Sequence, residues 1–360
     1  MIRRTGLGGA CRAVAILAAA ATAAACGTPA PSPYGPAQST ATATVWPSPP
    51  AMPRPSPPAM GPVGPYLHAV QLAVHDHLRV WIESDLVKRW EAGPSSFRAG
   101  IRRVAFLANR PAVAGVKIAD EMGYQDGLDS AQQVRQFLLA TTQALHAAAP
   151  HALILVDMVV PALGCLPGHQ PAGSPAASCA SQARAAYPQL ALPQIDSYLR
   201  LHVINVLDLS TGLLDGSTYA SWRTTINAAQ SAAWQEIARR GWPKLVTLQA
   251  RKALAHAGKY TGTAAQAEAD MRTYVDIPLS SGARAVDIWT WHQEYDGATY
   301  RLLNPGLKPN ALWTALALQH REHDVLFTHM SPTSVEGGLK PDLSTIATVF
   351  NGIFLPAGTG

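Results

Sequence analysis

Several common functional signatures are missing from this chain. Charged residues are only 14% of its 360 residues, and no long run of Lys and Arg occurs, which argues against a nucleic-acid partner. No Gly-rich phosphate loop follows the first segment of strand type, as it would in a dinucleotide-binding fold. The sequence also lacks a His-Glu-x-x-His zinc motif and a Gly-x-Ser-x-Gly nucleophile elbow. We therefore expect no nucleic acid, no metal and no cofactor.

Cysteine is scarce as well, with four in the chain. Cys11 falls in an apolar, Ala-rich N-terminal segment that has the pattern of a secretion signal. Cys165 and Cys179 flank a loop rich in Gly, Pro, Ser and Ala. In an oxidising exterior, two cysteines that bracket one flexible loop are most simply a disulfide. A zinc site is the weaker alternative, because only His169 lies close enough to add a ligand.

The N-terminal segment ends in three alanines directly before Cys26, which resembles the lipobox of bacterial lipoproteins. The resemblance implies cleavage before Cys26 and attachment of lipid to its sulfur; an ordinary signal peptide is the alternative. The apolar run is shorter than the roughly 20 residues that a membrane span needs. Removal of the signal takes away three arginines and leaves 25 basic against 23 acidic side chains, a charge of +2 instead of +5.

Three regions follow from composition. Residues 1–25 are the signal. Residues 26–65 start at the lipidated cysteine and are rich in Pro, Ala, Ser and Thr, which predicts an extended, unfolded stalk. Residues 66–360 form the folded domain. We expect a monomer outside the cytoplasm, held by lipid on the outer face of a bacterial cell membrane.

Strands and helices alternate along the folded domain. Segments of strand type occupy residues 78–82, 114–118, 152–156, 202–207, 244–248 and 285–289. Helical patterns cover residues 66–77, 94–109, 192–199, 219–240, 264–275 and 310–320, and another helix starts at Ser130 and ends before Pro150. Six such pairs fit a doubly wound sheet or most of a (β/α)8 barrel. Two further strands, at 325–329 and 353–355, favour a barrel that is circularly permuted and closes through its C-terminal tail; an incomplete barrel is the alternative.

The residues at the ends of these strands suggest a site. The stretch 114–123 is a short apolar run that ends in Asp120 and Glu121. In parallel α/β folds chemistry gathers at the C-terminal ends of the strands. Other segments of strand type also end in polar or ionisable groups: Glu83, Asp157, Asp208, Gln249, His292 and Glu294. His329 joins them only if the tail closes the barrel.

From Tyr66 onward the chain resembles the (β/α)8 retaining glycoside hydrolases of the cellulase-like clan. Three places carry the likeness: residues 71–83, the region from Leu107 to Val156 with Asp120-Glu121 on the family's fourth strand, and the Val286 to Trp291 run with Trp313 beyond it. The resemblance implies that Glu121 is the general acid/base and that Trp291, with Trp289, offers a face to a sugar ring. Barrel-top packing is the other interpretation of the two tryptophans.

The chain departs from that family at the nucleophile. The family's seventh strand ends in Glu, and here Gln249 stands in that place; a carboxamide cannot form the glycosyl ester of the retaining mechanism. The nucleophile has moved to Glu294, Asp157 or Glu83, or the enzyme is inverting, or the barrel only binds glycans. Chitinase-type barrels fit less well, because Lys117 and Ala119 replace their aspartates.

The sequence therefore predicts a tethered, glycoside-hydrolase-like barrel that acts on or recognises a glycan. Glu121, Glu294 and Asp157 are its candidate catalytic residues. The candidate substrate-binding residues are Glu83, Asp120, Asp208, Gln249, Trp289, Trp291 and His292. A non-catalytic carbohydrate-binding or scaffolding barrel is the alternative, favoured by Gln249.

Overall fold

The chain folds into a closed barrel of eight parallel strands. The computed structural model describes residues 62–124, 126–168 and 171–357, and the signal, Cys26 and nearly all of the stalk lie outside these ranges. Each barrel strand pairs with the next one along the chain. The barrel strands are β1 (Arg79–Glu83), β2 (Val113–Lys117), β3 (Leu153–Val159), β4 (Val206–Ser210), β5 (Thr247–Ala253), β7 (Ala285–Tyr295), β9 (Leu326–Met330) and β10 (Gly352–Pro356).

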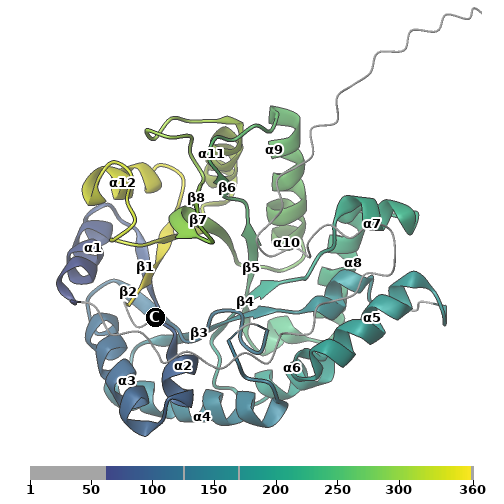
Figure 1. Ribbon diagram of the computed structural model, residues 1–360, viewed down its shortest axis with the longest axis horizontal. Helices are drawn as coiled ribbons and strands as arrows, with labels where there is room; N and C mark the ends of the chain where they lie inside the picture. Colours follow the sequence, from purple (N-terminus) through teal and green to yellow (C-terminus); the bar gives the residue numbers. More distant parts are fainter. Residues whose placement is uncertain (1–61, 125, 169–170, 358–360) are drawn as a thin grey trace, which may run out of the picture. The chain divides into compact units, whose positions relative to one another are not determined.

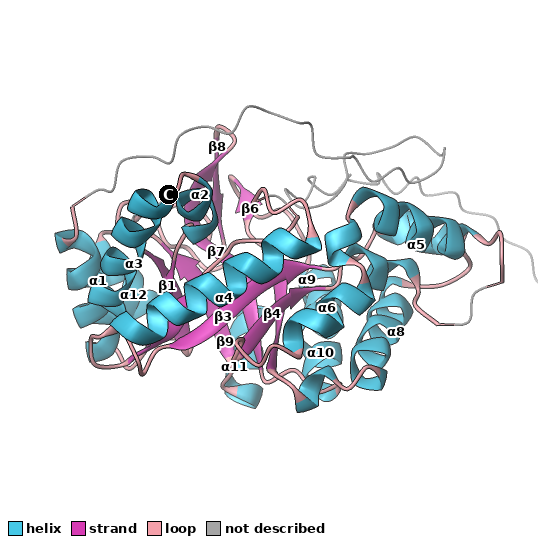
Figure 2. Cartoon of the chain, turned by 90° about the horizontal axis from the view of Figure 1, so that it is seen from below, coloured by secondary structure: helices cyan, strands magenta, loops and turns pink. Residues whose placement is uncertain are grey.

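Helices surround these strands (Figures 1 and 2). The α-helices are α1 (Gly64–His75), α2 (Leu86–Glu91), α3 (Pro94–Ala108), α4 (Ala131–Ala148), α5 (Pro175–Ala186), α6 (Leu192–Leu199), α7 (Gly216–Ser221), α8 (Ile226–Arg239), α9 (Ala264–Met271), α10 (Ile277–Ser280), α11 (Ala311–His323) and α12 (Leu339–Ile346). Short 3₁₀ turns are η1 (Pro161–Cys165), η2 (Pro188–Leu190) and η3 (Trp242–Lys244), and η4 (Arg272–Asp276) is a π-helix. No helix in the described part of the chain is both long and apolar enough to cross a membrane.

The C-terminal tail closes the barrel, as the sequence predicts. Strand β9 pairs with β7 on one side and with β10 on the other. Strand β10 then pairs with β1, with Gly352 opposite Arg79. The expectation of a closed (β/α)8 barrel is therefore confirmed, and the incomplete barrel is excluded.

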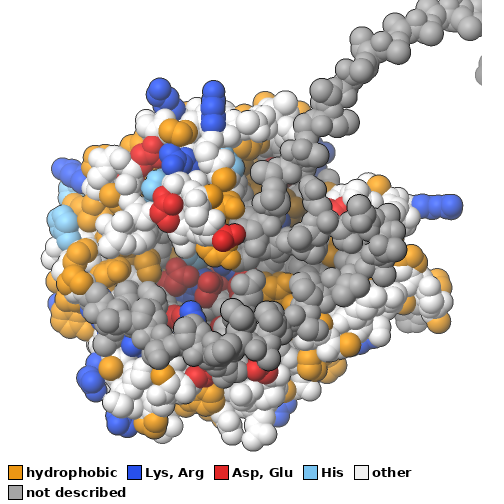
Figure 3. All heavy atoms as spheres, viewed as in Figure 1, with side chains coloured by type: hydrophobic (Ala, Val, Ile, Leu, Met, Phe, Trp, Pro, Cys, Tyr) orange, Lys and Arg blue, Asp and Glu red, His pale blue; other side chains and the backbone are white. Residues whose placement is uncertain are grey.

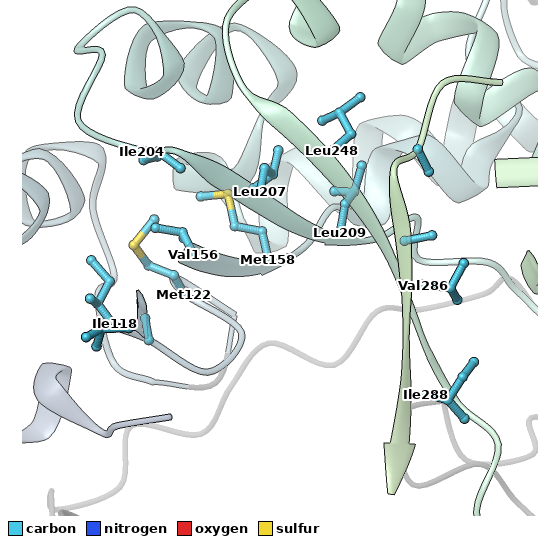
Figure 4. Packing of buried hydrophobic residues seen from close by; sticks show 14 of the residues in the cluster. Ile118, Met122, Val156, Met158, Ile204, Leu207, Leu209, Leu248, Val286 and Ile288 are labelled. Carbon is cyan, nitrogen blue, oxygen red and sulfur yellow. The ribbon is translucent and has the colours of Figure 1, made fainter. Parts of the chain in front are cut away.

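Successive side chains along each strand face alternately outward, toward the helices, and inward, into the barrel. Side chains that face outward are apolar and pack under the helices; Val156, Met158, Leu207 and Leu209 are examples (Figure 4). Side chains that face inward form two layers. The apolar layer consists of Trp81, Leu155, Val206, Phe327 and Phe354.

Two glycines make room for the large rings of the apolar layer. A Cβ on Gly115 would lie 2.6 Å from the Trp81 ring and 2.2 Å from the carbonyl oxygen of Leu153. A Cβ on Gly352 would lie 2.4 Å from the Phe327 ring. Both contacts are far inside van der Waals distance, so a larger residue at either position would push a ring out of the barrel.

Several boundaries differ from the sequence prediction. The strand predicted over 244–248 starts only at Thr247, after the η3 turn, and runs on to Ala253. A single helix over 219–240 is wrong: α7 ends where Arg223 adopts a left-handed φ of 58°, and Thr225 then caps α8. Strand β4 starts only at Val206, because His202 also has a positive φ of 54°. Strand β7 continues beyond residue 289 and forms a hairpin with β8 (Ala298–Arg301), which also pairs with β6 (His256–Ala257).

The predicted disulfide between Cys165 and Cys179 is present. Cys165 lies at the end of η1 and Cys179 in α5, and their Cα atoms are 5.6 Å apart. The bond therefore ties the loop after β3 to the following helix.

Candidate functional site

Charged side chains fill the barrel where its strands end. Those on the strands point inward by alternation: Glu83 follows Trp81 by two residues, Asp157 follows Leu155, and Lys117 is opposite Glu83. Asp120 and Glu121 come from the loop after β2 and reach the same place through contacts with Arg251. We call the group the mouth cluster; it comprises Glu83, Lys117, Asp120, Glu121, Asp157, Asp208, Arg251, Asp287 and His329. Figure 3 shows acidic side chains gathered at the centre of the face viewed.

Lys117 is the first of three cations in the mouth cluster. It is completely buried, and its Nζ lies 2.8 Å from Glu83 Oε1, 2.9 Å from Asp120 Oδ1 and 3.1 Å from Asp157 Oδ2. Burial alone would lower the pKa of Lys117, but these three carboxylates raise it well above its usual range. The ammonium group is therefore permanently charged.

Arg251 links carboxylates from three different segments. Its Nη1 lies 2.7 Å from Asp157 Oδ2 and 3.1 Å from Glu121 Oε1, and its Nη2 lies 3.3 Å from Asp120 Oδ1. Its Nε lies 3.6 Å from Asp287 Oδ2. The guanidinium thus holds the loop after β2 against strands β3 and β7.

His329 joins the opposite side of the cluster. Its Nδ1 lies 2.9 Å from Glu83 Oε2 and its Nε2 lies 2.8 Å from Asp287 Oδ2. Burial opposes protonation, but the two carboxylates raise the pKa of His329 to about 9. In turn His329 and Lys117 outweigh the burial of Glu83 and lower its pKa to about 2.

Glu121 and Asp120 are neighbours with opposite protonation. Glu121 is only 3% exposed, and burial raises its pKa to about 8, although Arg251 acts against this. Desolvation also acts to raise the pKa of Asp120, but Lys117 and Arg251 outweigh it and hold it below its ordinary value. Near neutral pH Glu121 therefore keeps a proton that it can donate, and the half-exposed Asp120 is an anion.

The remaining carboxylates show how the cluster limits its negative charge. Burial raises the pKa of Asp157 to about 6 and that of Asp208 well above its usual range. Neither oxygen of Asp208 has a hydrogen-bond partner in the part of the chain that the structure describes. The pKa of Asp287 is lowered, because His329 and Arg251 outweigh its burial. The cations thus face mainly ionised partners, while burial favours the protonated forms of Glu121 and Asp208.

A small cavity of about 50 Å³ adjoins Glu121. Arg251 and Lys252 of β5, Thr211 after β4, and Gln230 of α8 also line it. A cavity needs about 10–15 Å³ to hold one water, so this one has space for a few waters or a substituent of a ligand, but not for a whole sugar ring.

Several predicted residues lie outside the mouth cluster. Glu294 is exposed on the β7–β8 hairpin and accepts a hydrogen bond from Thr299. Trp291 is 2% exposed; its Nε1 donates to Asp342 Oδ2 at 2.8 Å and its ring packs against Trp313. His292 lies 3.0 Å from the Ser334 hydroxyl. The structure therefore does not bring these three together with Glu121.

Trp289 and Gln249 are buried residues of strands β7 and β5. Trp289 is 3% exposed and its ring contacts Tyr295 and Tyr300 of the hairpin. Gln249 pairs in register with Asp208 and is also buried. The predicted group of Glu83, Asp120, Glu121, Asp157 and Asp208 does meet at one mouth.

Two cations that hold these acids together, Lys117 on β2 and Arg251 on β5, are not among the predicted site residues. The buried acid Asp287 on β7 is not among them either, and His329 joins the site only because the barrel closes. Strand alternation was the available signal, because Lys117 and Arg251 have the inward parity of Glu83 and Asp157. In the described part of the chain, no three His, Cys, Asp or Glu side chains are placed to hold a metal ion.

No protein-family model matches this sequence, and no curated protein matches it. Among solved structures, the chain resembles Rhizobium etli pyruvate carboxylase (TM-score 0.39, 11% identity, 84% of this chain and 26% of that one). It also resembles xylanase 10B from Thermotoga petrophila (TM-score 0.39, 11% identity, 63% and 65%) and a 3-dehydroquinate dehydratase from Clostridium difficile (TM-score 0.32, 7% identity, 59% and 62%). This chain thus spans about a quarter of the first and two thirds or less of the others. These proteins differ in chemistry, and the resemblance is one of barrel fold.

Proposed function

We propose that the barrel mouth hydrolyses a glycan, with Glu121 as the general acid. The observation that carries the proposal is the pair formed by Glu121 and Asp120. One is a buried carboxylic acid with a pKa of about 8, the other is a half-exposed carboxylate, and both contact the same guanidinium. Two carboxyl groups whose environments separate their pKa values are what acid-base hydrolysis of a glycosidic bond uses.

In this proposal Glu121 protonates the leaving oxygen of the glycosidic bond. Asp120 is the second carboxylate, which activates water or attacks the sugar, because Gln249 cannot. Arg251 orients both groups and offsets the charge that Glu121 gains when it loses its proton. The placement at the C-terminal ends of the strands supports a catalytic role, since active sites of this fold lie there.

Reducing-sugar release from a panel of polysaccharides tests the proposal. We expect Glu121→Gln and Asp120→Asn each to lower turnover by roughly 10²-fold or more. Glu294→Gln is the matched control: it removes an exposed carboxylate on the hairpin and should leave turnover unchanged. Loss of activity only in Glu294→Gln would instead move the chemistry to the hairpin.

A non-catalytic glycan-binding barrel is the second candidate. The specific observation in its favour is that Glu121, Asp120 and Asp157 are all tied to Arg251, while an amide stands at Gln249. For this candidate we expect binding on a glycan array that persists in Glu121→Gln, together with no turnover by the parent protein.

We further propose that lipid on Cys26 tethers the barrel to the outer face of the cell membrane. The alanines before Cys26 support this proposal. Mass spectrometry of the mature N-terminus should find an acylated Cys26, and an unmodified N-terminus at another residue would refute it.

A further inference from the structure

A second and larger cleft, of about 580 Å³, lies at the opposite end of the barrel from the mouth cluster. It is formed where strands β4, β5 and β7 begin. Residues 202–205 precede β4, residues 243–246 precede β5, and residues 282–284 precede β7. Ligand pockets in proteins commonly measure about 300–1,000 Å³, so this cleft is large enough for a whole small molecule.

Backbone hydrogen bonds set the three segments side by side. The N–H of Thr247 donates to the carbonyl oxygen of Asn205 at 3.0 Å, and the N–H of Arg284 donates to that of Leu248 at 2.8 Å. Neighbouring strands lie about 4.8 Å apart, so the outer two of these segments are separated by roughly 10 Å at the backbone.

The cleft has basic side chains and no acidic ones. His202, Lys244 and Arg284 each come from a different one of the three segments, and all are exposed. No Asp or Glu is among the described residues that line it. Within the described ranges Lys244 and Arg284 take part in no ion pair, and neither does the His202 ring, unlike nearby Arg240, which is bound by Asp196 and Glu236.

This charge distribution contrasts with the mouth cluster, where every cation faces two or more carboxylates. Cations that the protein leaves without counter-ions can be satisfied by an anionic ligand. They stand on three separate segments whose backbones span roughly 10 Å, and the cleft of about 580 Å³ has space for more than one phosphate group. A chain of linked phosphate groups can contact all three.

We propose that this cleft binds a polyanion with closely spaced phosphate groups through His202, Lys244 and Arg284. Arg284 can form paired hydrogen bonds to one phosphate, and Lys244 supplies a point charge to the next. Such phosphates occur in soluble phosphorylated compounds and in lipid headgroups, and the cleft chemistry is the same for both. The site is independent of the proposed glycan chemistry at the mouth.

Calorimetric titration of the full chain with inorganic tripolyphosphate tests the site, at low and at high ionic strength. We expect binding that weakens as salt is added. The double variant Lys244→Ala/Arg284→Ala should lower the affinity by roughly tenfold or more, because it removes two charged contacts. Both residues are exposed, and thermal melting should show that the variant keeps its fold.

The matched control is Arg98→Ala/Arg102→Ala, which removes two exposed arginines from α3, away from the cleft. It should bind tripolyphosphate as the parent does, and so should Glu121→Gln. Co-sedimentation with cardiolipin vesicles, whose headgroup carries two phosphates, is the second arm: binding that is lost in the cleft variant assigns the phosphates to headgroups. Absence of binding in both arms, or equal losses in the cleft variant and the α3 control, would overturn the proposal.

Discussion

The interior of the barrel has an apolar layer and, two residues further along the same strands, a charged one. In the apolar layer, the ring of Phe354 packs against the rings of Trp81 and Phe327. In the charged layer each cation contacts two or more carboxylates, and those carboxylates are shared between cations. A change in the apolar layer removes one set of contacts, whereas a change in the charged layer takes one partner from several buried charges at once.

The largest effect is expected for Lys117→Ala. The substitution leaves Glu83, Asp120 and Asp157 without their shared cation, and removal of one partner of a buried ion pair commonly costs about 3–5 kcal/mol. Urea denaturation near neutral pH measures the free energy of unfolding. Lys88→Ala is the control: Lys88 pairs with Asp85 at 2.6 Å but is exposed, so the cost should be at most about 1 kcal/mol. Equal losses would mean that the mouth cluster is no more interdependent than a surface pair.

Asp287→Asn should have the next largest effect, of about 3 kcal/mol. Asp287 is completely buried and contacts both His329 and Arg251. The amide keeps the size of the side chain but removes its charge, and His329 can relieve part of the loss by releasing its proton. Urea denaturation near neutral pH measures this loss in the free energy of unfolding. A cost below about 1 kcal/mol would show that Glu83 alone is enough to hold the His329 cation.

The same comparison explains what the sequence could and could not reveal. Apolar runs marked all eight barrel strands, because burial under helices demands Val, Ile and Leu at outward positions such as Ile154 and Val156. The acids at the strand ends could also be recognised in the sequence, because each stands where an apolar run stops. They are Glu83, Asp120, Glu121 and Asp157.

The partners of those acids were not visible. Lys117 and Arg251 lie far apart in the sequence, and their contacts depend on the closure of the barrel and on strand register. Trp291 was predicted at the mouth, but the β7–β8 hairpin carries the chain onward, and Trp291 is buried against Trp313. No periodicity in residues 285–296 marks that change of direction.

The pH dependence of stability should also separate the two layers. Folded Glu121 has a pKa of about 8, against 4.5 for an exposed Glu, and folded His329 has a pKa of about 9, against 6.5 for an exposed His. Between the unfolded and folded pKa values of each group, the unfolded chain binds fewer protons than the folded chain. The free energy of unfolding therefore falls as pH rises, by up to about 1.4 kcal/mol per pH unit for each proton. Urea midpoints between pH 6.5 and 9 measure the slope.

Two variants sharpen this measurement. Glu121→Gln should flatten the slope, because a group whose pKa the fold raises to about 8 is gone. Leu155→Ala, in the apolar layer, should lower stability by about 2–5 kcal/mol at every pH and leave the slope as it was. The groups that surround Glu121 and His329, and so set the slope, are Glu83, Lys117, Asp120, Tyr124, Asp157, Tyr187, Arg251, Asp287 and Tyr295. A slope that Glu121→Gln leaves unaltered would contradict the assignment of a proton to Glu121.

The smallest effect is expected for Asp208→Asn, the counterpart of Asp287→Asn. Both aspartates are completely buried, but burial raises the pKa of Asp208 and the nearby charge of Asp287 adds to the rise, so the fold favours the neutral form of this side chain. Replacing a neutral acid by a neutral amide of the same size should cost at most about 1 kcal/mol near pH 7. At alkaline pH the variant should be the more stable protein, since the parent must then bury a charge or keep a costly proton. A loss as large as that of Asp287→Asn would instead make Asp208 an ionised member of the mouth cluster and add one more negative charge to the charged layer.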